Sequence, residues 1–418
     1  MPSNGIVKQA GRIPLGNLRG LAAVIASVAA VAIIYSVAAP LIALNLERRG
    51  VSSTINGFLA AVPSIAVLTA GVFIPRLVQR VGAVNSIYLG TGLSVLALLL
   101  FPVLDQLAAW FVLRFVMGAS IGLIWIVSET WVNGLAPEQS RGRIMGIYVA
   151  VLSAGSASGP LMVGLIGSQG SLPFVLSAAV LALAVLPIPF AKRNGGAPAF
   201  HRHTAMPLGD AVRRAPVAMT AALLHAAMWL CSMTLLPIYG VRAHLSEEQA
   251  LLLLSALIVG GMIGQVPIGH LLDRWSAGKL LILAGLAQTA FAIALPVIRD
   301  LDLILWPAAL VAGAFGGGIY AIALTILGRA FTTDELPSAN TAFTMIWELG
   351  AFCGPILGGI AMQIWNPHGM LAVSGLGGLA LILLGSRAGL GDRTGGDRTG
   401  GGGDPTRGDH PTQGDGGS

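Results

Sequence analysis

The chain has 418 residues, of which 55% are hydrophobic and only 10% are charged. Soluble domains carry about 25% charged residues, so the composition excludes an ordinary soluble domain and indicates an integral membrane protein. A net charge of +6 and a pI of about 9.8 would also suit nucleic-acid binding. The basic residues argue against that function, because they gather in the loops on one side of the predicted membrane spans.

Long apolar runs recur along the chain, each close to the roughly 20 residues that a membrane-spanning helix needs. Their continuous apolar character favours helices over barrel strands, in which apolar residues alternate. The first run exceeds the roughly 7–15-residue apolar core of a cleaved signal peptide, so we expect an uncleaved first helix. We predict an all-α integral membrane fold with twelve spans, at residues 18–44, 54–76, 84–104, 107–135, 141–168, 171–191, 215–243, 247–272, 277–299, 302–331, 335–364 and 367–386.

A polar, basic segment rich in Pro and Gly divides the predicted spans into two sets of six. We predict an N-terminal six-helix bundle over 1–191, a cytoplasmic linker over 192–214 and a C-terminal six-helix bundle over 215–386. Residues 391–418 contain no large apolar side chain, so nothing there offsets the entropy of ordering. We therefore predict a disordered cytoplasmic tail over 387–418.

The two predicted bundles share residues at a nearly constant offset. At a shift of about 195 residues, glycines and one Gly-Pro pair of the first half fall on the same residues in the second, which indicates a duplicated six-helix unit. The matched residues are Gly90 with Gly285, Gly118 with Gly313, Gly159-Pro160 with Gly354-Pro355, and Gly164 with Gly359. Transporters built from such repeats hold their substrate near mid-membrane, between the halves.

Five motifs resemble those of one known family, the major facilitator superfamily. They are GHLLDR at 269–274, PRLVQR at 75–80, RFVMG at 114–118, GSASGPLMVG at 155–164 and GAFCGPILGG at 350–359. The resemblance covers the whole chain except the tail, although Gln79 replaces the acidic residue of the family pattern. A local stretch, Glu129-Thr130-Trp131-Val132-Asn133, resembles the E-S-W-x-N sequence of a bacterial subgroup.

The resemblance implies a fold of two pseudo-symmetric six-helix bundles and a monomeric, multi-pass carrier of the bacterial inner (plasma) membrane. Such a carrier moves a small solute by alternating access and is not an enzyme. The family associates the Gly-Pro motif of the fifth helix with antiporters, which favours export. The concentration of Lys and Arg in the loops on the side of the termini predicts that both termini are cytoplasmic.

Small residues recur four positions apart on the predicted fifth and eleventh helices, a spacing that favours close helix packing. They lie on one helix face, where they let helix backbones approach closely in a membrane, and prolines beside them allow a bend. The alternative is packing without any moving part. The residues that we assign to packing or hinges are Gly118, Gly155, Gly159, Pro160, Gly350, Gly354, Pro355 and Gly359.

Three charged residues fall inside predicted spans, where a charge costs about 2.5–3.5 kcal/mol on insertion scales. We expect Glu348, and with it Glu129, to carry protons, and Arg114 to be their counter-charge. Two other readings stay open: Glu129 is a gate or interfacial residue, and Glu348 is a buried structural carboxyl. Neither acid has an acidic counterpart at its repeat-related position. This suggests that the acids serve a function that was added to the duplicated scaffold.

Aromatic residues accompany these charges on the helices that line the cavity in the family. His225 and Trp229 lie one turn apart on the seventh helix, and Tyr35, Trp125 and Tyr320 lie on the first, fourth and tenth. We expect these five residues to line the substrate pathway. Packing alone is the competing interpretation for each of them.

Charges in the predicted cytoplasmic loops suggest a latch between the halves. Asp273 lies in the motif that runs from Gly269 to Arg274. It would pair with Arg141 or Arg143 when the carrier faces outward. In the other half, Arg76 and Arg80 would face Asp334 and Glu335. The competing reading treats all of these residues as anchors that only fix the topology.

Enzyme, cofactor and metal readings find little support. SAGK at 276–279 has the S-x-x-K spacing of penicillin-recognising enzymes but no companion motif, and no phosphate-binding loop is present. Cys231 and Cys353 both fall within spans, which argues against a zinc site or a disulfide framework. We therefore predict no cofactor and no nucleic-acid partner. The favoured function is proton-coupled antiport of a small organic solute, the alternatives being uptake of a small anion or metabolite and a non-transporting sensor or assembly protein.

Overall fold

The computed structural model describes residues 15–135, 141–188, 206–332 and 334–396. The regular structure in these ranges is helical. The first half contains α1 (Leu15–Arg48), α2 (Ser53–Gly71), α3 (Ile74–Val81), α4 (Ala83–Leu100), α5 (Leu107–Leu135), α6 (Arg141–Ile166) and α7 (Leu172–Ala184). The second half contains α9 (Leu208–Arg214), α10 (Pro216–Arg242), α11 (Glu247–Leu272), α12 (Ala277–Ile298), α13 (Asp302–Ala330), α14 (Leu336–Ile364) and α15 (Gly369–Gly396).

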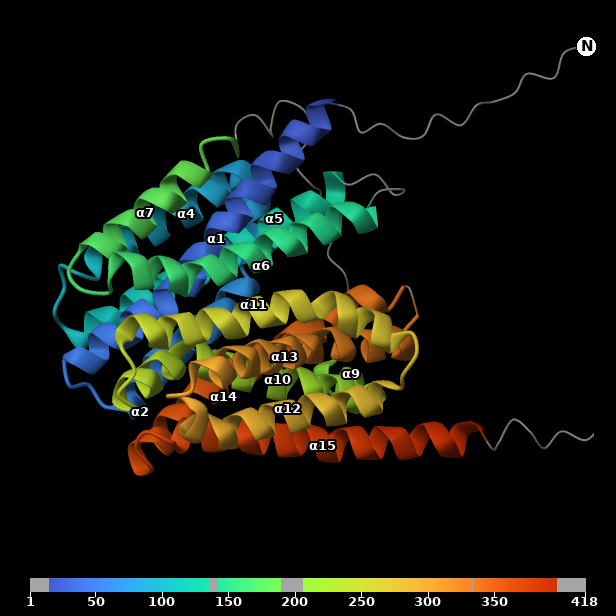
Figure 1. Cartoon of the computed structure of the whole chain (residues 1–418). Coiled ribbons are helices and arrows are strands. Elements are labelled where there is room, and N and C mark those ends of the chain that lie inside the picture. Colours follow the sequence, from blue (N-terminus) through green and yellow to red (C-terminus); the bar gives the residue numbers. More distant parts are fainter. Residues whose placement is uncertain (1–14, 136–140, 189–205, 333, 397–418) are drawn as a thin grey trace, which may run out of the picture.

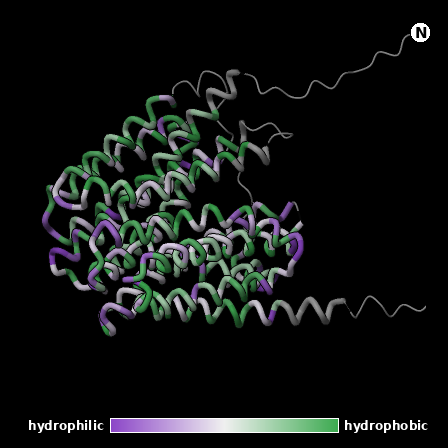
Figure 2. The backbone as a smooth tube through the Cα atoms, in the orientation of Figure 1, coloured by the Kyte–Doolittle hydropathy of each residue, from purple (hydrophilic) through white to green (hydrophobic). Residues whose placement is uncertain are grey.

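Ten of the described helices are long and apolar enough to cross a membrane. They include every helix of the predicted spans except α6 and α7, which contribute the shorter apolar stretches Ala150–Ile166 and Leu172–Ala184. Hydrophobic residues run along the helices, while hydrophilic residues gather near their ends (Figure 2). The chain is thus an all-helical, multi-pass membrane protein, and the exact number of twelve spans stays a prediction.

The helices form two bundles, α1–α7 and α10–α15, which lie one above the other in Figure 1. Each bundle has its own buried core, made largely of Val, Leu, Ile and Ala side chains. A third apolar cluster joins the two, because Ala39, Ala43 and Ala157 of the first bundle pack with buried residues of the second. The bundles meet through α2 with α14, α6 with α11 and α1 with α10.

The bundles are tied together at one end, which we call the closed end. There Arg242, the last residue of α10, donates from Nε and Nη2 to the two carboxylate oxygens of Glu47 in α1, at 2.7 Å each. Arg48 and Arg242 are the last residues of the equivalent helices α1 and α10. The ion pair therefore joins Arg242 to Glu47, the neighbour of its counterpart in the other half.

A second ion pair lies beside the first at the closed end. Arg48 of α1 pairs with Glu247 of α11, and Ser168 links them by accepting from Arg48 and donating to Glu247. Gln363 of α14 accepts from the backbone N–H of Ser53 at 3.3 Å. All ion pairs that join the bundles within the described ranges lie at this end.

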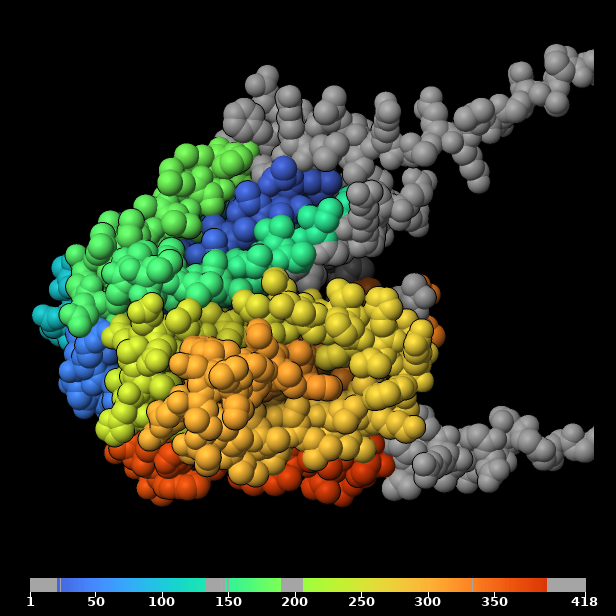
Figure 3. All heavy atoms as spheres, viewed as in Figure 1, coloured from blue at the N-terminus to red at the C-terminus, as the bar shows by residue number. Residues whose placement is uncertain are grey.

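At the opposite end the bundles diverge, toward the right of Figure 1 where α9 lies. In Figure 3, atoms of α6 and α11 touch along the near face. The short helix α3 packs against its neighbours α2 and α4. The structure is therefore closed at one end and open at the end that carries α3 and α9.

Several element boundaries differ from the sequence predictions. The predicted span 54–76 ends early, because the chain turns after Gly71 and restarts as α3, which has Pro75 at its first turn. Part of the predicted linker forms the helix α9. The predicted tail begins too soon, because α15 runs to Gly396 through a stretch without proline. Residues 189–205 and 397–418, on which the rest of the linker and tail predictions fall, lie outside the described residues.

Candidate functional site

Two of the three charged residues predicted inside the membrane interact with the same tyrosine. Tyr35 of α1 lies within electrostatic range of both Arg114 of α5 and Glu348 of α14. Tyr35 and Arg114 belong to the N-terminal bundle, and Glu348 belongs to the C-terminal bundle. Tyr35 thus interacts with charged residues of both bundles.

Arg114 is buried, with only 4% of its surface exposed. Its Nε and Nη1 atoms find no hydrogen-bond partner within the described part of the chain. Buried polar groups normally have partners, and a buried cation without one is costly. The guanidinium is therefore available to a group that the protein itself does not supply.

Glu348 lies on the interface between the bundles. Its carboxyl contacts the hydroxyl of Ser64, a buried residue of α2. The α2–α14 pair is the closest packing between the bundles, since a Cβ built on Gly57 or Gly359 would meet backbone of the opposite helix at less than 3.0 Å. Any separation of α2 from α14 would therefore change the surroundings of Glu348.

Glu129 lies about four helical turns further along α5 than Arg114. Its side chain is exposed, and it lies within electrostatic range of Tyr148 of α6 and Tyr320 of α13. Trp125, one turn earlier on α5, is 37% exposed, and Tyr320 is 40% exposed. The structure thus places Glu348 against α2 and Glu129 near aromatic side chains of both bundles.

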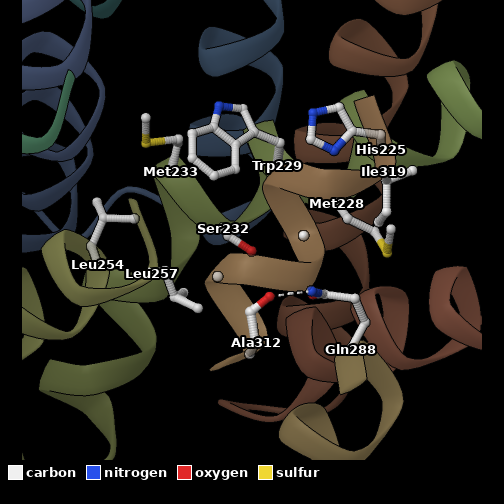
Figure 4. A pocket seen from close by; sticks show the side chains of 12 residues that line it. His225, Met228, Trp229, Ser232, Met233, Leu254, Leu257, Gln288, Ala312 and Ile319 are labelled. Atoms are coloured by element: carbon white, nitrogen blue, oxygen red, sulfur yellow. Dashed lines mark hydrogen bonds between the residues drawn. The ribbon is translucent and has the colours of Figure 1, made fainter. Parts of the chain in front are cut away.

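The predicted aromatic residues of the C-terminal bundle form a connected group. The rings of His225 and Trp229 lie 6.1 Å apart and nearly parallel, and the ring of Tyr320 lies 5.9 Å from that of His225. Behind His225 and Trp229 is a cavity of about 30 Å³, across which Gln288 Nε2 donates to the carbonyl of Ala312 at 2.7 Å (Figure 4). A volume this small holds about one water molecule, so the cavity itself is no substrate site.

Trp347 joins the site from α14. It packs with Tyr35 and Trp229 around a buried cluster formed by Ala226, Leu230 and Ala351. Its indole Nε1 is buried and has no hydrogen-bond partner within the described ranges. Sequence reasoning missed both Trp347 and Ser64. The one available signal was that Trp347 directly precedes Glu348 in the motif.

The motif glycines lie at close helix contacts. In α14, a Cβ on Gly350 or Gly354 would meet the backbone of α10, and in α6 a Cβ on Gly155 or Gly159 would meet α1. Gly118 of α5 faces Pro63 of α2 in the same way. Pro160 and Pro355 lie inside their helices. The equivalent helices of the two halves therefore use equivalent contacts, while a hinge role stays a prediction.

Among the described side chains of the predicted cytoplasmic latch, no ion pair joins the two bundles. Glu335 binds Arg214 of its own half instead, through two hydrogen bonds of 2.7 and 2.9 Å. Arg76, Arg80, Asp273, Arg274 and Asp334 are exposed. The side chains of Arg141 and Arg143 lie outside the described residues, and a Cβ on Gly269 would meet open space. The latch of Asp273 with Arg141 or Arg143 stays a prediction for the state in which the end that carries α3 and α9 is closed.

No group of three or more His, Cys, Asp or Glu residues that could hold a metal ion occurs among the described residues. Cys231 is buried against Gly358, and Cys353 is half-buried. The site therefore consists of charges and aromatic rings, enclosed by two helical bundles that contact each other mainly at one end. This architecture defines a membrane transporter of small solutes.

The chain belongs to the Major Facilitator Superfamily, whose sequence profile matches residues 21–312. It is 26% identical over 340 residues to the MFS-type transporter YfkF of Bacillus subtilis strain 168, covering 78% of this chain and 84% of that protein. It is also 24% identical over 295 residues to the MFS-type transporter YcaD of Escherichia fergusonii, covering 70% and 75% of the two chains. The local resemblance at Glu129 to Asn133 stays an expectation.

Solved structures share the fold at low sequence identity. The nucleoside transporter NupG, as its D323A mutant, is 14% identical with a TM-score of 0.69, covering 89% of this chain and 98% of that chain. A bacterial homolog of the lysosomal transporter Spinster, inward-facing and occupied, is also 14% identical with a TM-score of 0.70, covering 90% and 96%. A D-xylose-proton symporter matches with a TM-score of 0.67 at 14% identity, covering 87% and 96%.

Proposed function

We propose that the chain is a proton-coupled secondary active transporter that moves a small organic solute by alternating access. The contact of Glu348 with Ser64 across the α2–α14 interface supports this function. A carboxyl at an interface that opens and closes changes its surroundings in each cycle, which is what a proton carrier needs. The likeness in fold to a D-xylose-proton symporter agrees with proton coupling.

In this mechanism the present structure is the state that faces the side of α3 and α9. With both termini in the cytoplasm, as the basic loops predict, this state faces inward. Rocking of the bundles would then open the closed end, separate Glu348 from Ser64 and expose the carboxyl to the outside. The cytoplasmic latch of Asp273 with Arg141 and Arg143 would form in that second state.

The direction of transport has two candidates. The Gly-Pro motif of α6, which the family associates with antiporters, favours proton-driven export of an amphipathic molecule. The unpartnered guanidinium of Arg114 favours the other candidate, coupled uptake of a small anion, because an anion would supply the missing partner. The same measurement separates them: protons move against the solute in antiport and with it in symport.

The test is proton flux in liposomes that contain the purified protein. A stability screen over nucleosides, sugars, organic acids and amphipathic cations first identifies a solute that binds. A pH-sensitive dye inside the vesicles then reports whether adding that solute moves protons. We expect coupled flux in the wild type, loss of coupling in Glu348→Gln, and normal flux in Asp302→Asn, which neutralises an exposed acid at the start of α13, a helix whose main contacts are with its own bundle. Unchanged coupling in Glu348→Gln would remove that residue from the mechanism, and solute binding without flux would favour a sensor.

A further inference from the structure

We infer that the substrate is an organic anion with a planar ring, bound through its anionic group to Arg114, and that it moves together with a proton. This inference rests on the proposed proton-coupled transport and names the substrate class of the same site. It draws on three features: two guanidinium nitrogens without partners among the described residues, the aromatic side chains that share a cluster with Tyr35, and the electrostatic interaction of Tyr35 with both Arg114 and Glu348.

The guanidinium of Arg114 is the group that needs a ligand. It is 4% exposed, and two of its nitrogens lack partners in the described part of the chain. Glu348, which interacts electrostatically with Tyr35, contacts Ser64. A planar guanidinium with free N–H groups recognises a planar carboxylate through paired hydrogen bonds. A carboxylate at this position would remove the cost of an unpaired buried cation.

The side chains around the guanidinium determine which chemical group the rest of the substrate carries. Tyr35, which interacts electrostatically with Arg114, packs against the same buried cluster as Trp229 and Trp347, both of the C-terminal bundle. The buried Nε1 of Trp347 has no partner among the described residues, so it can donate to a second acceptor of the ligand. Aromatic rings favour stacked or edge-on contact with another ring, by about 0.5–1.5 kcal/mol beyond the burial of area. A planar ring therefore suits the space between the two bundles better than a compact, hydrated anion does.

The third feature couples the anion to the proton. An anion at Arg114 and an ionised Glu348 would both lie close enough to Tyr35 to act on it electrostatically, and like charges in such a poorly solvated region repel. The anion therefore binds best when Glu348 carries its proton, and the proton binds best when the anion is present. Two ligands that favour each other's binding travel in the same direction. This relation selects symport from the two candidate directions.

A binding experiment on the full chain in detergent tests the substrate class without any variant. The probes share one ring system and differ in charge: 2-naphthoate, the neutral 2-naphthamide and the cationic 2-naphthylmethylammonium, with cyclohexanecarboxylate as the anion without an aromatic ring. Tryptophan fluorescence and thermal stability report binding. We expect 2-naphthoate to bind at least tenfold more tightly than each of the other three. Tighter binding of the ammonium compound, or equal binding of the amide, would overturn the anion assignment.

Variants then test the residue. Arg114→Gln should weaken 2-naphthoate at least tenfold and leave 2-naphthamide unchanged, whereas Arg299→Gln, which removes an arginine paired with Asp300 outside the interface, should change neither. Arg114→Lys keeps the charge but loses the paired geometry, so we expect intermediate affinity. Equal affinity of 2-naphthoate for the wild type and Arg114→Gln would show that Arg114 does not bind the anion.

Proton exchange tests the coupling. Adding 2-naphthoate to the protein in weakly buffered solution should take up protons in the wild type and not in Glu348→Gln, while proton release would overturn the predicted direction. The two proposals fail separately. If no anionic probe binds but another solute drives protons, only the substrate class is wrong. If 2-naphthoate binds yet no solute moves protons in liposomes, the proposed transport is wrong.

Discussion

Gly57 of α2 faces the carbonyl group of Pro355 in α14, and a Cβ built on Gly57 would lie closer than 3.0 Å to that oxygen. Two helices of different bundles are in backbone contact here, at the closed end. The contact exists only because neither residue presents a side chain to the other. Closure of this end therefore depends on the absence of a single carbon atom.

Gly57→Ala should prevent the closed end from closing fully. Overpacking a tight contact costs about 1–3 kcal/mol, which is enough to favour the alternative state strongly. We expect normal insertion and folding. Spin labels at Gln169 and Asp302, which are exposed residues of opposite bundles at this end, measure the opening. The distance between them should shift to longer values. The labels are placed in a background in which alanine replaces Cys231 and Cys353.

Gly71→Ala is the matched control, because it lies in the same helix and a Cβ there meets nothing within 4 Å. Its distance distribution should equal that of the parent. If Gly57→Ala also left the distribution unchanged, the α2–α14 contact would not limit closure.

Gly354→Ala should instead weaken the C-terminal bundle itself. A Cβ at this position would collide with the backbone of Ala227 in α10, a helix of the same bundle. We expect thermal unfolding in detergent to shift to lower temperature, in line with a cost of about 1–3 kcal/mol, with no preference for either conformational state. Gly269→Ala, whose Cβ faces open space in α11, should unfold like the wild type.

The ion pair of Glu47 with Arg242 should hold the closed end shut. Its side chains are only 19% and 20% exposed, so loss of one partner leaves a poorly solvated charge. We expect Glu47→Gln to shift the ratio of closed to open ends by about 5–30-fold, equivalent to about 1–2 kcal/mol. The same label pair measures the shift.

The charge-reversed double variant, Glu47→Arg with Arg242→Glu, restores an ion pair and should restore most of the closed population. Arg299→Gln breaks a pair within one loop of one bundle and should have no effect. A double variant as open as the single one would mean that packing, and not the ion pair, keeps this end shut.

The predicted latch at the opposite end should form when the closed end opens. Cysteines at positions 141 and 273, in the same cysteine-free background, should cross-link weakly in the parent protein and more strongly when Glu47→Gln is added. If the closed end opened without any gain in cross-linking, the pairing of Asp273 with Arg141 would be wrong.

The contact between α9 and the start of α14 should resist acid. Hydrogen bonds from Arg214, and then from the backbone and hydroxyl of Thr332, lower the pKa of Glu335 to about 2. A carboxyl with a lowered pKa stabilises the folded arrangement above its ordinary pKa and loses that effect only as the pH falls toward the lowered value. We expect constant protection of the α9 amides from about pH 5 to pH 8, after correction for intrinsic exchange.

Glu335→Gln should reduce the protection of the α9 amides from hydrogen exchange across this whole pH range. The neutral amide side chain has one oxygen and no charge, so it cannot accept two charge-assisted hydrogen bonds from Arg214. Asp334→Asn changes the neighbouring acid, which is exposed, and should have no effect. Protection that fell steeply between pH 7 and pH 5 would show that another group, and not Glu335, controls this contact.

Most of the fold follows from the sequence because the membrane restricts the choice of structure. Apolar runs of spanning length must be helices, and the repeated glycines align the halves before any coordinates are known. The boundaries were less predictable. The break between α2 and α3 and the extension of α15 to Gly396 depend on where a helix leaves the bundle, which hydropathy does not report.

The site was predictable in its ionisable members and not in its neutral ones. Arg114, Glu129 and Glu348 stand out because a charge in an apolar run is rare. Ser64 and Trp347 do not, since serine and tryptophan are ordinary residues of membrane helices. Their roles depend on the approach of α2 to α14 and on the packing of Tyr35 and Trp347 against one buried cluster, which are properties of the assembled bundles.

The two ion pairs at the closed end also bear on the charge that each bundle exposes when this end opens. Arg48 and Arg242 are the last residues of α1 and α10, and each pairs with a glutamate of the opposite bundle. Each bundle therefore supplies one arginine and one carboxylate. When the pairs separate, neither bundle is left with a net charge from these four residues.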